Sequence, residues 1–91
     1  MDYETYSRKA RQLARKNYNG DIPDHMDVDH IFSCKHGYTL AIPLDVLSHC
    51  ANLRLIPKHD NRSKGERSDI NLVELDNITG WGEGETDAGP R

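Results

Sequence analysis

Residues 28–31 read VDHI, residues 52–56 read NLRLI and residues 60–65 read DNRSKG, and these three stretches decide the predicted fold. The first two are rich in branched apolar residues, which predicts two short strands. Asp60 is a residue type that caps the start of a helix, and Gly65 is a type that ends one, so a short helix is predicted between them. The sequence therefore predicts an α+β fold in which two short antiparallel strands and a helix surround a polar centre.

A longer amphipathic helix is predicted over residues 2–18. Apolar side chains recur there at helical spacing on one face, so we expect residues 1–20 to form a helix packed on the core. The opposite face carries three arginines: Arg8, Arg11 and Arg15. These arginines are either phosphate contacts or part of an ordinary solvated helix face, and the sequence leaves both interpretations open.

The rest of the chain completes one small domain. Residues 32–51 form a long connection, in which residues 42–47 are expected to hold a short helical turn because a proline suits a first helical position. Residues 69–78 carry enough apolar side chains to pack back on the core, so the core is assigned to residues 21–79. Residues 80–91 are acidic and rich in glycine, and we expect them to be disordered.

Composition limits the classes of protein to which this chain can belong. Its 91 residues suffice for one domain, and only 35% of them are hydrophobic, which predicts a thin core. No apolar run approaches the roughly 18 residues of a membrane span. No basic and then apolar leader is present, so no secretory signal is expected. Two cysteines, Cys34 and Cys50, are too few for a disulfide framework, which favours a reducing, cytoplasmic setting.

Charge is distributed unevenly along the chain. The formal net charge is −3, yet residues 1–73 carry 11 Lys and Arg against 10 Asp and Glu. The remaining residues, 74–91, carry five acidic side chains against one arginine. The overall charge therefore neither favours nor excludes a nucleic-acid partner, and the local arrangement of basic residues must decide.

Polar residues in and beside the two strands carry the candidate chemistry. Asp29 and His30 lie in an otherwise apolar strand, where burial costs free energy unless they have partners. His30 can act as a base on water, because an ordinary imidazole titrates near neutral pH. Asp29 and Asn61 are hard oxygen ligands that suit Mg²⁺ or Mn²⁺, and Arg62 and Lys64 can bind phosphate beside the ion. Each residue alone also fits a structural role, but together they supply what phosphodiester hydrolysis needs.

Taken in this order, the three stretches resemble the ββα-metal motif of HNH endonucleases over about residues 26–67, and the stretch between the strands is similar to phage-type members. The resemblance implies a ββα-metal finger preceded by the amphipathic helix. It also implies that His30 is the general base and that Asp29 and Asn61 bind the metal. Asn52 matches the central asparagine, which braces the loop and helps to position the histidine. Asn61 at the third motif position makes this an H-N-N variant, as in the HNH domain of RNA-guided CRISPR nucleases.

A metal-dependent DNA endonuclease or nicking enzyme is the activity that the resemblance implies, with 5′-phosphate and 3′-hydroxyl ends as products. Double-stranded DNA is the expected partner, although no residue excludes RNA, and no membrane partner is expected. Six basic residues are candidate backbone contacts: Arg8, Arg11, Arg15, Arg54, Arg62 and Lys64. One divalent cation, Mg²⁺ or Mn²⁺, is the expected cofactor. No structural zinc is expected, because the chain lacks the two C-x-x-C pairs that bind zinc in many members. A monomer would nick and a homodimer could cut both strands, and both remain open.

Two other functions also remain open. In the first, the chain is a non-catalytic nucleic-acid-binding module that uses the same basic residues, and the pair Asp29 and His30 is structural. In the second, it is a small zinc-stabilised interaction protein with four candidate ligands: Cys34, His36, His49 and Cys50. The spacing of these four residues fits the familiar zinc modules poorly.

Strand geometry constrains how Asp29 and His30 can serve one site. Neighbouring residues in a strand point to opposite faces. We therefore expect Asp29 to face the short helix and to meet Asn61 across the ion. His30 is expected to reach the scissile phosphate from the other side of the strand, through a bend or a frayed end.

Overall fold

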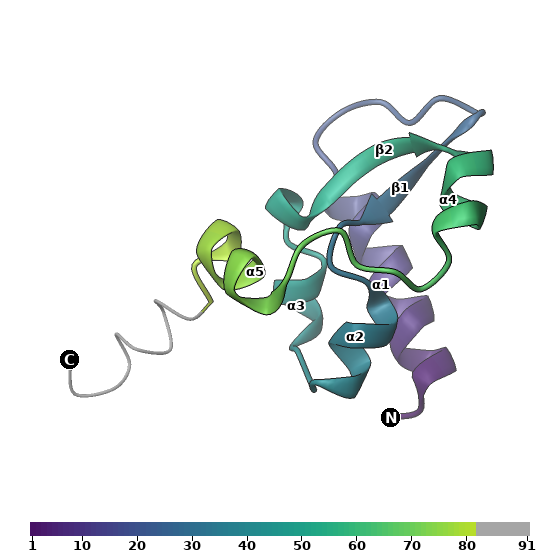
Figure 1. The fold of residues 1–91 in the computed structure, drawn as a ribbon. Helices are drawn as coiled ribbons and strands as arrows, with labels where there is room; N and C mark the ends of the chain where they lie inside the picture. The colour runs from purple at the N-terminus through teal and green to yellow at the C-terminus, as the bar shows by residue number, and fades with distance from the viewer. Residues whose placement is uncertain (82–91) are drawn as a thin grey trace, which may run out of the picture.

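The computed structural model describes residues 1–81, which fold as a small α+β unit with a two-stranded antiparallel sheet. The strands are β1 (Met26–His30) and β2 (Leu53–Pro57). The helices, in chain order, are α1 (Tyr3–Asn17), α2 (Cys34–Thr39), α3 (Leu44–Leu47), a 3₁₀ turn (Cys50–Asn52), α4 (Lys58–Lys64) and α5 (Leu72–Thr79). Helix α1 lies against β1, α2 and α3, so it forms the layer on which the rest of the chain is built (Figure 1).

Helix α1 confirms the amphipathic helix predicted from the sequence. It is capped by Asp2, whose carboxylate accepts a hydrogen bond from the backbone N–H of Thr5 at 2.8 Å. Its inner face buries Tyr6, Ala10 and Ala14. Small side chains at the last two positions let α1 approach its neighbours closely, and the backbone carbonyl of Ala10 lies 2.9 Å from Oγ of Ser48.

Strands β1 and β2 pair in a register that opposes Asp29 to Arg54 and His30 to Leu53. Helix α4 follows β2 without a loop, so strand, strand and helix form one ββα unit (Figure 1). The prediction that Asp60 caps this helix is wrong. The cap is Pro57, whose fixed φ suits the change from strand to helix, and Asp60 lies in the first turn. The helix ends as predicted at Gly65, which adopts the left-handed φ of 58°.

The connection between the strands holds more structure than the sequence predicted. The expected helical turn is present as α3, but helix α2 was not predicted. Ser33 caps α2, since its hydroxyl accepts from the backbone N–H of His36 at 3.2 Å. Gly37 lets α2 pack tightly, because a β-carbon there would lie 2.7 Å from a methyl group of Leu47. Tertiary contacts of this kind stabilise a six-residue helix that is too short to form alone.

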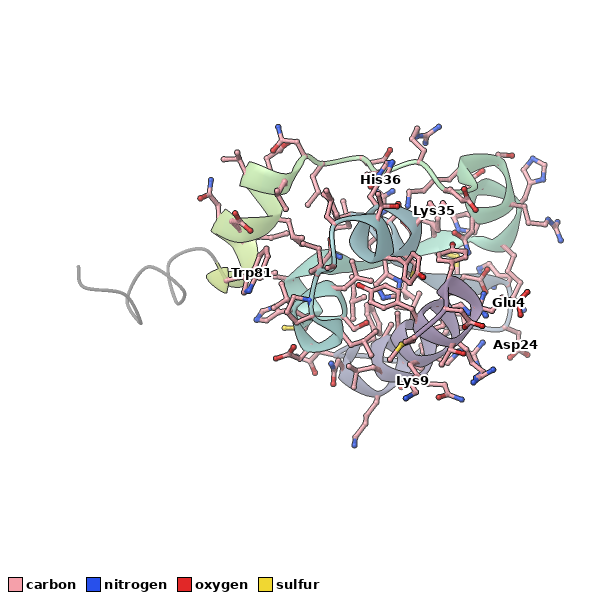
Figure 2. The ribbon with its side chains drawn as sticks, turned by 90° about the horizontal axis from the view of Figure 1, so that it is seen from below. Glu4, Lys9, Asp24, Lys35, His36 and Trp81 are labelled. Atoms are coloured by element: carbon pink, nitrogen blue, oxygen red, sulfur yellow. The ribbon has the colours of Figure 1, made fainter. Side chains whose placement is uncertain are left out.

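A small core joins these elements. Its buried members come from α1, the connection and α5: Tyr6, Ala10, Phe32, Ile42, Leu47 and Leu75. The prediction that residues 69–78 pack back on the core is confirmed, since Leu75 of α5 is fully buried. Trp81 also packs against this core, at the junction between α5 and the body of the fold (Figure 2). Most of the segment predicted to be disordered, 80–91, lies outside the described residues.

No helix among residues 1–81 is long and apolar enough to cross a membrane.

Candidate functional site

His30 is the last residue of β1, and its side chain is directed into the protein interior. It is only 5% exposed. Its Nε2 lies 2.9 Å from Oγ of Ser48, and its Nδ1 lies 3.5 Å from Sγ of Cys34. Burial is the main reason that the pKa of His30 falls to about 4, and it outweighs the nearby carboxylate of Asp29, which acts in the opposite direction. The imidazole is therefore neutral at pH 7, and it is a weaker base than the histidine titrating near neutral pH that the sequence predicted.

Asp29 points to the other face of β1, toward α4, as the alternation of side chains along a strand requires. It is buried and held by two cations. Nζ of Lys64 lies 3.0 Å from Oδ1, and Nε of Arg54 lies 3.0 Å from Oδ2. Arg54 is also paired with Asp69, which is paired in turn with Arg67. The expected orientation of Asp29 toward the helix is present, but its direct partner on α4 is Lys64.

Asn61 contacts a carboxylate that the sequence analysis did not single out. Its amide nitrogen donates to Oδ2 of Asp27 at 3.0 Å. Asp27 and Asp29 lie two residues apart on one face of β1, and Asn61 and Lys64 lie one turn apart on α4. Asp27 therefore contacts Asn61, and Asp29 contacts Lys64. That spacing was visible in the sequence, so Asp27 could have been found from the period of the strand.

One cavity collects most of the predicted catalytic and metal-binding residues. It has a volume of about 280 Å³ and lies between α1, β1 and α4. Its lining includes the five candidate site residues that lie on β1 and α4: Asp29, His30, Asn61, Arg62 and Lys64. Arg11 of α1 and Cys34 of α2 also line this cavity. The fold thus brings to one concave site residues that lie more than 30 positions apart in the chain.

The three arginines of α1 face a second cavity beside the first. This cavity has a volume of about 470 Å³ and is lined by Arg8, Arg11 and Arg15 together with Asp27 and Asn61. Arg11 and Asn61 line both cavities, so the two lie next to each other. All three arginines are exposed. The arginine row therefore borders the candidate site.

The remaining basic candidates differ in how exposed their charges are to solvent. Arg62 is exposed and lines the first cavity. Lys64 is buried, since its ammonium donates to both Asp29 and the backbone carbonyl of His30, the latter at 2.8 Å. Arg54 is half-buried in its two ion pairs. Lys64 and Arg54 thus form ion pairs with Asp29 inside the site. Arg62 and the α1 arginines are exposed to solvent.

Asn52 is fully buried and braces the connection between the strands. Its side-chain oxygen accepts from the backbone N–H of Phe32 at 2.8 Å. Its amide nitrogen donates to the carbonyls of Leu47 at 2.7 Å and of Phe32 at 3.2 Å. These contacts fix the chain two residues after His30, so Asn52 acts on the histidine through the backbone.

The four residues of the zinc alternative are not gathered into one cluster. Cys34 lies beside His30, while Cys50 and His49 are neighbours on the 3₁₀ turn. Within residues 1–81, no group of three or more His, Cys, Asp or Glu side chains is placed to hold a metal ion. Burial also raises the pKa of Cys34 to about 11, which keeps it a neutral thiol.

The donor set around the first cavity is compatible with one divalent cation of the Mg²⁺ type. Such ions are commonly held by one or two protein oxygens, with water and phosphate completing the shell. An ionised carboxylate offers about four lone-pair sites, and two hydrogen bonds to Asp29 leave the others available. Asn61 uses its amide nitrogen toward Asp27, which leaves its oxygen as an acceptor. Asp29 and Asn61 are the residues that would hold the ion.

Comparison with known proteins gave no match: no family model fits the chain, and neither a curated protein nor a solved structure is significantly similar to it.

Proposed function

We propose that this chain is a metal-dependent DNA endonuclease or nicking enzyme of the HNH type, with β1, β2 and α4 as its ββα-metal finger. The observation that carries the proposal is the shared cavity, in which a neutral buried histidine, a carboxylate, an asparagine and an exposed arginine meet. Each is a group that phosphodiester hydrolysis uses, and they come from the two elements, β1 and α4, that the motif requires.

His30 is the proposed general base. Its neutral imidazole would accept the proton of the attacking water, and His30 is among the residues that line the cavity shared by Asp29 and Asn61. A divalent cation, when bound, supplies stabilisation of the charge that develops on the phosphate and on the leaving oxygen. Asp29 and Asn61 would hold that cation, while Lys64 and Arg54 fix the carboxylate of Asp29.

Double-stranded DNA is the proposed substrate, and its backbone runs along the arginine row of α1 to the catalytic cavity. Arg8 and Arg15 are seven residues apart, which on a helix corresponds to about 10 Å. Successive base pairs rise by about 3.4 Å, so the row spans roughly three nucleotides of one strand. Arg62 contacts the phosphate nearest to the site, because it alone of the exposed candidates lies on α4 beside Asn61.

Metal dependence is the first test. We expect supercoiled plasmid to be converted to nicked or linear product with Mg²⁺ or Mn²⁺ and to remain intact with chelator, because the cation supports the leaving oxygen. The proportion of nicked to linear product reports whether one strand or both are cut, and thus whether a monomer or a homodimer acts. Equal cleavage in chelator would contradict the assignment of Asp29 and Asn61.

The arginine row predicts the salt dependence of DNA binding. Each phosphate contact contributes about 0.9 to the slope of log affinity against log salt on duplex DNA, so replacing Arg8, Arg11 and Arg15 by glutamine is expected to reduce the slope by about 2.7. The measurement is fluorescence anisotropy with a labelled duplex over a range of NaCl concentrations. Lys9 and Lys16 lie on another part of α1, at a separate surface cavity, and their replacement by glutamine is the matched control. An unchanged slope in the arginine variant would exclude this path.

A non-catalytic nucleic-acid-binding module is the second candidate. The observation that favours it is the pairing of Asp29 with Lys64 and Arg54, because two cations at one carboxylate oppose the approach of a third. This function predicts binding with the same arginine dependence but no cleavage with any metal. The plasmid assay and the anisotropy measurement together separate the two functions. For either function we propose a cytoplasmic setting, which would be the host cytoplasm for a phage-encoded protein.

A further inference from the structure

The imidazole of His30 lies between two side chains that the sequence did not place near it. Ser48 follows α3 and is fully buried, with its Oγ 2.9 Å from Nε2 of His30. Cys34 begins α2, with its Sγ 3.5 Å from Nδ1. Both ring nitrogens therefore have a partner, and the chemistry of those partners determines which nitrogen carries the proton.

The hydroxyl of Ser48 has a second partner that limits what it can offer to the histidine. Its Oγ lies 2.9 Å from the backbone carbonyl of Ala10 in α1, and it donates there because a carbonyl only accepts. A hydroxyl has a single proton, so Oγ presents a lone pair to the imidazole. The proton in the contact between His30 and Ser48 then belongs to Nε2.

The contact at the other ring nitrogen supports the same assignment. In the opposite assignment, Nδ1 would carry the proton and direct it at the sulfur of Cys34, which is a weak acceptor. The neutral thiol of Cys34 instead suits Nδ1 as a weak donor to its lone pair.

We infer that Ser48, together with the Ala10 carbonyl, is a positioning residue that holds His30 in the Nε2–H tautomer and so makes Nδ1 the basic atom. The catalytic part of this inference rests on the proposed nuclease function, whereas the tautomer does not depend on it. Helix α1 then contributes to the site through its backbone as well as through its arginines, because the carbonyl of Ala10 accepts the hydrogen bond that orients Ser48.

The tautomer can be measured directly. In uniformly ¹⁵N-labelled protein at pH 7 with chelator, long-range ¹H–¹⁵N spectra distinguish a protonated ring nitrogen from a bare one. We expect wild-type His30 to show one tautomer with the proton on Nε2, Ser48→Ala to show a measurable fraction of the other, and Ser48→Thr to retain the wild-type pattern. Asn17→Ala is the matched control, since Asn17 donates to the carbonyl of Ser48 at 2.9 Å and leaves the hydroxyl untouched. A wild-type proton on Nδ1 would overturn the inference even if Ser48→Ala does not fold.

Single-turnover cleavage tests the catalytic part. We expect Ser48→Ala to lower the rate about 10- to 100-fold with DNA affinity unchanged, the usual effect of losing a group that orients a functional histidine. Ser48→Thr and Asn17→Ala are expected to cleave near the wild-type rate. If wild type cleaves and folded Ser48→Ala matches it, Ser48 has no positioning role. If wild type itself does not cleave, the proposed function and this catalytic role fail together, while the spectra still decide the tautomer.

Discussion

His30→Ala is expected to abolish plasmid cleavage while leaving DNA binding close to that of wild type. His30 is the one neutral, buried base in the cavity that also holds Asp29 and Asn61, and loss of a general base costs roughly 10²- to 10⁴-fold in rate. Binding is expected to persist because the exposed arginines lie on α1 and α4, whereas the ring nitrogens of His30 lie beside Ser48 and Cys34. The measurement is single-turnover cleavage of plasmid in Mg²⁺ beside anisotropy with a labelled duplex.

A second histidine variant serves as the matched control, because it shows whether replacing any histidine of the domain lowers the rate of cleavage. His59 is exposed on α4, so His59→Ala is expected to cleave at the wild-type rate. Because His30 is buried against Ser48, thermal unfolding of each variant must show that the domain is still folded at the assay temperature. A folded His30→Ala protein that cuts at the parental rate would remove His30 from the reaction and move the assignment of the base to another residue.

Asn52→Ala is expected to produce a large loss of stability, about 3–5 kcal/mol in the free energy of unfolding. The side chain is fully buried and makes three hydrogen bonds to backbone groups of Phe32 and Leu47. Alanine leaves those groups buried without partners, at roughly 1–3 kcal/mol for each unsatisfied group. A domain of this size has a total stability of about 5–14 kcal/mol, so the loss is a substantial fraction of it. Urea-induced unfolding monitored by circular dichroism measures it.

Asn77 provides the comparison for this second variant, because it is exposed on α5. Asn77→Ala is expected to change the free energy of unfolding by no more than about 0.5 kcal/mol. If Asn52→Ala were equally mild, the chain between the strands would have to repack around the missing amide, and the bracing role of Asn52 would be wrong. The loss of stability also bears on activity, since Asn52 fixes the backbone at Phe32, two residues beyond His30.

Local sequence signals predicted much of the framework. The apolar spacing of residues 2–18 predicted α1, the two short apolar stretches predicted β1 and β2, and Gly65 predicted the end of α4. These signals are local because a helix or strand is set mainly by residues a few positions apart and by the residues that cap it. Helix α2 was missed for the same reason. Its six residues contain a glycine and a threonine and show little helical preference, and packing of Gly37 against Leu47 and Tyr6 forms it.

The predicted site residues of β1 and α4 line one cavity, but the sequence did not show which side chains each of them contacts. The sequence indicated that Asp29 would face the short helix, yet Lys64, not Asn61, is its direct partner there. It indicated Lys64 as a phosphate contact, yet that side chain is buried in an ion pair. It gave no sign that Ser48 meets His30, whereas the strand period could have placed Asp27 beside Asp29 but did not identify Asn61 as its partner.

The sequence by itself determined the order of strand, strand and helix. It also determined the apolar face and the arginine face of α1, and it placed a carboxylate beside a histidine, Asp29 and His30, in β1. The tertiary structure decided which of those residues touch, which arginines stay exposed and which side chains lie beside the two ring nitrogens of His30. The physical reason is the distance along the chain: Ser48 is 18 residues from His30, and Lys64 is 35 residues from Asp29. Contacts between such distant residues follow from how the whole core packs, and they leave no periodic pattern in the sequence from which to read them.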